Sequence, residues 1–129
     1  MLPAASQPAR LDLNVDGLRS DRGVVRICVT SHADHFPNCH SDPGARRVNV
    51  PAGQPIPVID GLPSGDYAIA LFHDENGNRQ LDRMAGIPKE GVGFSNNPRL
   101  MFGPPRFAEA RFALTNEPVG ERVRIKYFL

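Results

Sequence analysis

The polar residues whose spacing most clearly suggests chemistry lie between Asp74 and Asp82. This run reads Asp-Glu-Asn-Gly-Asn-Arg-Gln-Leu-Asp, with side-chain oxygens at its first, third, fifth and ninth positions. A hard cation such as Ca²⁺ takes about six to eight oxygen ligands, and alternate positions of a tight loop can supply them. The spacing therefore predicts a weak Ca²⁺ site. Its predicted ligands are Asp74, Asn76, Asn78, the carbonyl oxygen of Gln80, and Asp82.

Two positions of this run differ from the EF-hand pattern. Arg79 occupies the sixth position, where glycine normally allows a sharp turn, and Ala85 occupies the twelfth, where a bidentate glutamate is usual. Glu90 is a candidate replacement for that glutamate. With few carboxylates, the dissociation constant should be about 10⁻⁴ to 10⁻³ M. The alternative is that the Asp and Asn side chains close consecutive Asx-turns without any ion.

A second set of candidate residues surrounds this run and would contact an unidentified ligand or protein partner. These residues are His73, Glu90, Phe94, Asn96 and Asn97. The competing interpretation is that the polar members satisfy the loop's own backbone amides. In that interpretation Phe94 anchors the loop rather than stacking on a ligand.

The sequence offers little for catalysis. A small periplasmic hydrolase using His73, Asp74 and Glu90 is the alternative to a binding protein, but no Ser or Cys lies in a recognisable nucleophile elbow. Neighbouring side chains on a strand also point to opposite faces, so His73 and Asp74 should not form a pair. We predict that the protein is not an enzyme.

The two cysteines, Cys28 and Cys39, are separated by ten residues that also contain histidines. A disulfide across so short a loop would stabilise the fold by about 3 kcal/mol. We predict this disulfide; the alternative is a buried free thiol at Cys28 and an unrelated exposed Cys39. His32, His35 and His40 could hold Zn²⁺ or Cu, but their spacing matches no closed metal motif, so exposed loop histidines are the prediction.

Length and charge favour one domain and exclude some partners. The chain has 129 residues, with 15 basic and 14 acidic side chains, which gives no electrostatic basis for binding nucleic acid or an anionic membrane. No apolar run is long enough to insert into a membrane. Residues 1–9 are predicted to be a flexible tail that follows a removed export signal, and residues 10–129 a single domain.

Period-two alternation dominates the domain and predicts strands. Segments 11–15 and 25–29 should form a hairpin, and segments 46–50 and 55–59 should be edge strands. Segment 65–72 is apolar on both faces, as expected of a central strand. Segments 106–114 and 123–127 complete the set, and the basic face formed by Arg122, Arg124 and Lys126 should be solvated.

These elements predict an all-β fold, an antiparallel two-sheet β-sandwich of about seven strands with one long structured loop. That loop, residues 74–105, is too apolar for a solvated linker. It should pack its own side chains over one end of the sandwich, and we call it the cap loop.

Several runs together resemble a known bacterial family. They are Leu62-Pro63-Ser64-Gly65-Asp66-Tyr67, Phe72 to Asn78, Leu81-Asp82, Gly86 to Gly91, and Gly93-Phe94-Ser95-Asn96-Asn97. From about Leu11 to Tyr127 the chain resembles the exported family of domain of unknown function 2141. The resemblance implies a periplasmic or secreted location and a prealbumin-like or collagen-adhesin B-type sandwich, some of which bind Ca²⁺ in a similar loop. The family commonly has Gly where this chain has Arg79.

The leading functional hypothesis is an exported, non-enzymatic binding module. Its recognition surface would be the part of the cap loop up to Asn97, together with His73, and its cofactor a weakly bound Ca²⁺. Besides the hydrolase, a third hypothesis is a structural or assembly domain that acts through its sheet edges.

Overall fold

The computed structural model describes residues 9–39, 42–81, 83–84, 87–100 and 103–129, so residues 1–8 of the predicted tail lie outside this part. In chain order its elements are β1 (Ala9–Asp16), β2 (Val24–Thr30), η2 (Ala33–His35), β3 (Arg46–Pro51), β4 (Ile59–Leu62), β5 (Gly65–Asp74), β6 (Arg83–Met84), β7 (Ile87–Pro88), β8 (Val92–Phe94), α1 (Phe107–Ala110), β9 (Phe112–Leu114) and β10 (Val119–Arg124). Within the described residues, no helix has the length and apolar character needed to cross a membrane.

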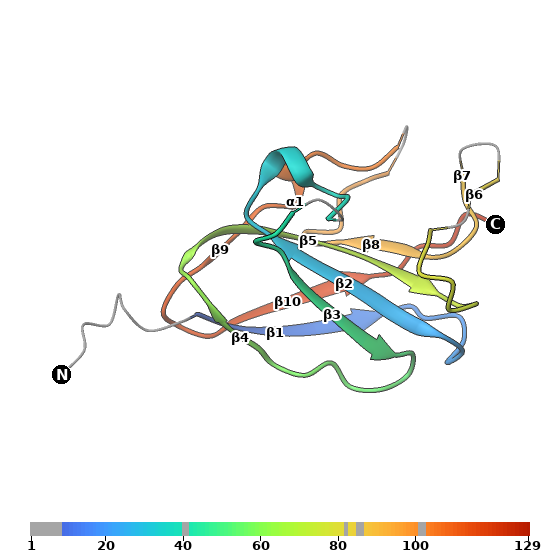
Figure 1. The fold of residues 1–129 in the computed structure, drawn as a ribbon, viewed down its shortest axis with the longest axis horizontal. Helices are drawn as coiled ribbons and strands as arrows, with labels where there is room; N and C mark the ends of the chain where they lie inside the picture. Colours follow the sequence, from blue (N-terminus) through green and yellow to red (C-terminus); the bar gives the residue numbers. More distant parts are fainter. Residues whose placement is uncertain (1–8, 40–41, 82, 85–86, 101–102) are drawn as a thin grey trace.

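The strands form two packed sheets, which confirms the predicted β-sandwich (Figure 1). One sheet has the order β10-β1-β4. The other has the order β3-β2-β5-β8, and β9 pairs with the beginning of β5. A short hairpin of β6 and β7 lies within the cap loop. As predicted, the segment containing β3 lies at a sheet edge.

Strand β5 is the central strand of the larger sheet and is buried on both faces. Tyr67, Ile69 and Leu71 face the core between the sheets. On the opposite face, Ala68 and Ala70 pack in a second apolar cluster with residues of β8 and α1. This double burial matches the continuous apolar sequence of the strand.

The predicted hairpin of segments 11–15 and 25–29 is wrong. Strand β1 pairs with β10 and β4, whereas β2 pairs with β3 and β5, so residues 17–23 cross from one sheet to the other. The β1–β10 pair is also parallel, so the sandwich is only largely antiparallel. Alternation specifies which face of a strand is buried but not which strand lies beside it.

Two other predicted strands begin later than expected. In segment 106–114 the residues Phe107–Ala110 form a helical turn, because the Glu109 carboxylate accepts the backbone N–H of Arg106 at 2.9 Å. Only Phe112–Leu114 is a strand. Segment 55–59 yields a strand only from Ile59, since Pro55 and Pro57 have no N–H to donate to a ladder.

The cap loop contains regular structure that its sequence did not reveal. Strand β8 extends the larger sheet beside β5. Val92 also exchanges two backbone hydrogen bonds with Lys126, at 3.0 and 2.8 Å. These bonds join the two sheets along this side of the sandwich. The basic residues Arg122, Arg124 and Lys126 are exposed, as predicted.

The predicted disulfide between Cys28 and Cys39 is confirmed. The two Cα atoms are 6.4 Å apart, and both residues are buried. The bridge ties the segment after β2 back to β2 itself. This segment connects the central part of the larger sheet to its edge strand β3.

Replacing both cysteines with alanine should lower the free energy of unfolding by about 3 kcal/mol, because the unfolded chain is no longer closed across this loop. Urea unfolding of the oxidised wild type and the double variant measures the difference. Reduced wild type is the control and should unfold close to the double variant. Equal midpoints for the oxidised and reduced proteins would contradict the prediction.

Candidate functional site

The first predicted ligand, Asp74, is fully buried at the end of β5. Its Oδ2 accepts hydrogen bonds from Arg26 Nε at 2.7 Å and from the backbone N–H of Arg79 at 2.8 Å. Its Oδ1 is also buried but has no hydrogen-bond partner among the described residues. An unsatisfied buried carboxylate oxygen is costly, so a cation or donor at this atom would stabilise the protein.

Arg79 adopts the backbone conformation expected of the glycine that it replaces. Its φ angle is 67°, in the left-handed region, and its N–H points back to Asp74. A residue with a Cβ adopts this conformation at a cost of about 1–2 kcal/mol. The unusual residue at the sixth position therefore does not prevent the sharp turn.

The hydrogen bonds of the loop match the predicted Asx-turns. Asn76 Oδ1 accepts the N–H of Asn78 at 3.2 Å, and Asn78 Oδ1 accepts the N–H of Gln80 at 3.0 Å. A carbonyl-type oxygen has two lone pairs, so these bonds are compatible with cation coordination. Asp82 lies outside the described residues. Within the described ranges, no cluster of three or more His, Cys, Asp and Glu residues is arranged to hold a metal ion.

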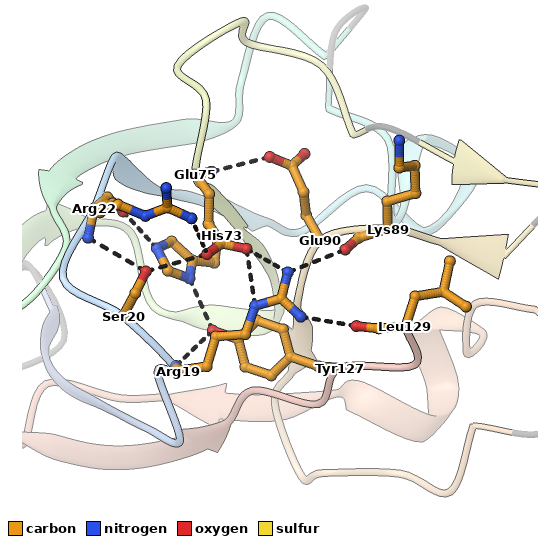
Figure 2. Close-up of polar contacts among 9 residues, drawn as sticks. All are labelled: Arg19, Ser20, Arg22, His73, Glu75, Lys89, Glu90, Tyr127 and Leu129. Carbon is orange, nitrogen blue, oxygen red and sulfur yellow. Dashed lines mark hydrogen bonds and ion pairs between the residues drawn. The ribbon is translucent and has the colours of Figure 1, made fainter.

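Glu90, the candidate for the missing glutamate, folds back against the beginning of the Asp74 loop. It is buried, and its Oε2 accepts the backbone N–H of Glu75 at 2.9 Å (Figure 2). This bond places the Glu90 carboxylate beside the second residue of the predicted Ca²⁺ loop. The structure thus brings Asp74 and Glu90 to the same end of the sandwich.

Glu75 anchors the loop to the connection between β1 and β2. Its Oε1 accepts two hydrogen bonds from Arg19, at 3.0 and 2.6 Å, and its Oε2 accepts the Ser20 hydroxyl at 3.1 Å (Figure 2). The hydrogen bond from Arg19 is the main reason that the pKa of Glu75 is lowered. In turn, Glu75 raises the pKa of the Arg19 guanidinium.

Arg19 also holds the end of the chain. Its Nη1 donates to the Leu129 carbonyl at 2.8 Å, and its guanidinium carbon lies 4.4 Å from the centroid of the Tyr127 ring. The Arg19 side chain therefore links three parts of the chain: residues 17–23 between β1 and β2, the beginning of the Asp74 loop, and the C-terminal residues.

His73 points into the sandwich, away from Asp74, as the strand geometry predicts. Its Nε2 lies 2.7 Å from the Arg22 carbonyl oxygen, which can only accept, so Nε2 is protonated. In the neutral ring, Nδ1 then accepts the Tyr127 hydroxyl at 2.8 Å. Both nitrogens of this fully buried imidazole are bonded within the protein.

Two glycines let the backbone approach closely around this network. A Cβ on Gly23, whose φ is 75°, would lie 2.1 Å from the Asp74 carbonyl oxygen. A Cβ on Gly91 would lie 2.5 Å from the Tyr127 ring. Nothing in the sequence around Gly23 indicates that this part of the chain lies against Asp74.

The remaining candidates lie further along the cap loop and bond the fold's own backbone. Asn97 accepts the N–H of Arg124 at 2.8 Å and donates to the Arg122 carbonyl at 2.9 Å. Asn96 donates to the Arg111 carbonyl at 2.8 Å. Phe94 is buried against Phe36, with ring centroids 6.0 Å apart. These three side chains are not part of the cluster around Asp74.

Replacing Arg79 with glycine should raise the free energy of unfolding by about 0.5–1 kcal/mol, because the relieved left-handed strain exceeds the added flexibility of the unfolded chain. Thermal and urea unfolding measure the change. Gln80→Gly is the matched control, because its φ is not positive, and it should destabilise the protein slightly. Destabilisation by both substitutions would show that Arg79 is not strained.

Glu75→Gln should destabilise the protein less at low pH than at pH 7. Since the folded-state pKa lies below the ordinary value of 4.5, ionised Glu75 adds stability above about pH 4.5 and loses it as the pH falls through the folded-state pKa. Urea midpoints of both proteins between about pH 7 and pH 3 give the comparison. Glu117→Gln, at an exposed position, is the control and should show little difference at any pH. If Glu75→Gln lowers the urea midpoint by the same amount at every pH, the result would contradict a stabilising interaction of ionised Glu75 with Arg19.

Comparison with known proteins identifies a family but no function. No curated protein and no solved structure matches the chain. Residues 13–121 match the family described as "Uncharacterized protein conserved in bacteria (DUF2141)". This match covers most of the described domain, from the second half of β1 into β10. The chain therefore belongs to the DUF2141 family of proteins conserved in bacteria.

Proposed function

We propose that this protein is an exported, non-enzymatic binding module that holds Ca²⁺ in the Asp74 loop. The supporting observation is the buried Oδ1 of Asp74, which has no hydrogen-bond partner in the described part of the chain. Its sister oxygen is bonded to the backbone of Arg79 on the far side of the turn, so the carboxylate lies within the loop. A cation on Oδ1 would satisfy this oxygen.

The charges around the loop favour weak binding. Arg26 lies 2.7 Å from Asp74 Oδ2 and neutralises part of the charge that would attract a cation. Neutral amide and carbonyl oxygens from Asn76, Asn78 and Gln80 would supply other ligands. We therefore expect a dissociation constant of about 10⁻³ M, in the range of extracellular modules.

Export is supported by the disulfide and by the bacterial family. Disulfides persist in the periplasm and outside the cell and are rare in the cytosol. A millimolar Ca²⁺ site also suits an extracellular environment better than a cytosolic one.

A binding role rather than catalysis is supported by the state of the polar groups. The His73 imidazole is buried and bonded through both nitrogens, and Asp74 lies on the opposite face of β5. A general base needs access to the proton that it removes. The surface left for a ligand is the exposed rim of the cap loop between His73 and Asn97.

Calorimetric titration of the disulfide-bonded protein with Ca²⁺ tests the proposal. With a dissociation constant of about 10⁻³ M, about 10 mM Ca²⁺ should stabilise the folded protein by about 1.4 kcal/mol. The melting temperature should rise accordingly. Equal concentrations of Mg²⁺, which demands a smaller octahedral site, should have much less effect.

Asp74→Asn should abolish the Ca²⁺-dependent shift while preserving the shape of the side chain. Loss of the Arg26 partner also lowers baseline stability, so the readout is the shift on adding Ca²⁺. Asp60→Asn, an exposed aspartate on β4, is the matched control and should retain the full shift. No heat at about 10 mM Ca²⁺, or equal shifts in the two variants, would overturn the proposal.

A further inference from the structure

A second polar cluster lies in the disulfide-bonded segment between β2 and β3. Asp42 is 2% exposed and accepts hydrogen bonds from the Thr30 hydroxyl, from His32 Nδ1 at 2.8 Å and from the backbone N–H of Gly44 at 3.0 Å. Because the Thr30 hydroxyl and the Gly44 N–H both donate to it, the Asp42 carboxylate is a fixed acceptor.

This carboxylate determines which nitrogen of His32 carries the proton. Because two other donors already identify Asp42 as the acceptor in this cluster, His32 donates to it from Nδ1, and in the neutral ring Nε2 keeps its lone pair. The His32 side chain is 50% exposed. Its bonds to Asp42 and Thr30 use Nδ1 and the backbone N–H, not Nε2. A carboxylate on one imidazole nitrogen with the other nitrogen available is the usual arrangement of a metal-binding histidine.

The His32 ring is also held in place sterically. It lies over Gly44, where a Cβ would be only 2.9 Å from His32 Cε1. The backbone N–H of Asp42 donates to the Cys39 carbonyl at 3.2 Å, which connects Asp42 to the disulfide. The donor nitrogen is thus fixed by the fold rather than carried on a free loop.

A second imidazole lies beside the first. The 3₁₀ turn η2 begins after His32, and His35 N–H donates to the His32 carbonyl at 3.1 Å. Side chains three residues apart eclipse in such a turn. The two ring centroids are 6.0 Å apart, with an interplanar angle of 78°.

This separation fits two rings on one metal ion. A cation about 2.0–2.1 Å from a ring nitrogen lies about 3.2 Å from the ring centroid. Two rings on one cation then have centroids about 5 Å apart at a tetrahedral angle and about 6.4 Å apart when opposite. The observed 6.0 Å lies between these limits.

We propose that His32 and His35 form a binding site for a divalent cation that prefers imidazole, Cu²⁺ or Zn²⁺, with Asp42 as the outer carboxylate that orients His32. This site is independent of the Asp74 loop, whose ligands are all oxygens. Two nitrogen donors leave further coordination positions to water or an external ligand, so the site is open.

A metal site explains the cluster better than acid–base catalysis does. The Thr30 hydroxyl in this cluster belongs to a residue that is 1% exposed and is bonded to Asp42, so it cannot serve as a nucleophile. The neighbouring imidazole of His35 adds a second nitrogen donor. A metal ion is bound more tightly by two imidazoles than by one, whereas a general base does not need a second imidazole.

Titration of the disulfide-bonded protein with Cu²⁺, followed by electron paramagnetic resonance, and with Zn²⁺, followed by calorimetry, tests the site. The expected result is one bound Cu²⁺ with two nitrogen donors. His32→Ala and His35→Ala should each weaken binding at least about tenfold, and Asp42→Asn should weaken it about 10- to 100-fold. Melting curves and a free-thiol assay show whether each variant remains folded and bridged.

His40→Ala is the matched control, because it removes an imidazole from the same segment without changing the proposed ligands; it should bind Cu²⁺ as the wild type does. If Asp42→Asn fails to fold, the His32→Gln and His35→Gln pair carries the test. Absence of Cu²⁺ binding, or loss of binding in His40→Ala with retention in His35→Ala, would overturn the proposal. Asp74→Asn should bind Cu²⁺ normally, which separates this result from the Ca²⁺ experiment.

Discussion

From Tyr67 to its last residue, strand β5 is largely buried on both faces, and this constraint shapes the end of the sandwich. Its final side chains, His73 and Asp74, point to opposite faces and are both fully buried. Buried polar groups must be satisfied inside the protein. The His73 side is closed by Tyr127 and the Arg22 carbonyl, whereas the Asp74 side recruits Arg26 and the backbone of Arg79. One central strand thereby fixes the connection between the sheets, the C-terminal residues and the cap loop.

The two faces of β5 differ in how completely their buried polar atoms are hydrogen-bonded. Each polar atom of the His73 ring has a partner, and the network continues from Tyr127 to the Arg19 backbone at 3.1 Å. On the other face, Asp74 Oδ1 has no hydrogen-bond partner among the described residues, although Arg79 adopts a strained conformation in which its N–H bonds Asp74 Oδ2. Strain and an unsatisfied oxygen at the same turn are typical of sites where local stability is sacrificed for binding.

Sequence periodicity predicted the sandwich because burial of alternate residues is a local property of each strand. The double burial of β5, the edge position of β3 and the disulfide could all be read from neighbouring residues. Which strands pair could not be predicted in this way, because the parallel contact of β1 with β10 joins residues over a hundred positions apart. The same limit applies to the site. Asp74 and Glu90 were identifiable, but Arg19, Arg26 and Tyr127 are ordinary residues that become important only through tertiary contact.

Two carboxylates illustrate how the same group serves different chemistry. Asp74 would contact a hard cation directly, yet Arg26 shares its charge, so its electrostatic attraction is reduced. Asp42 instead bonds an imidazole and would strengthen a metal ion's ligand without touching the ion. The first arrangement would suit oxygen coordination in a loop of consecutive Asx-turns. The second needs a fixed ring, and a disulfide-bonded turn over Gly44 supplies that rigidity. If both proposed sites bind, the preferred metal would follow from the group that each buried carboxylate faces, rather than from the number of carboxylates.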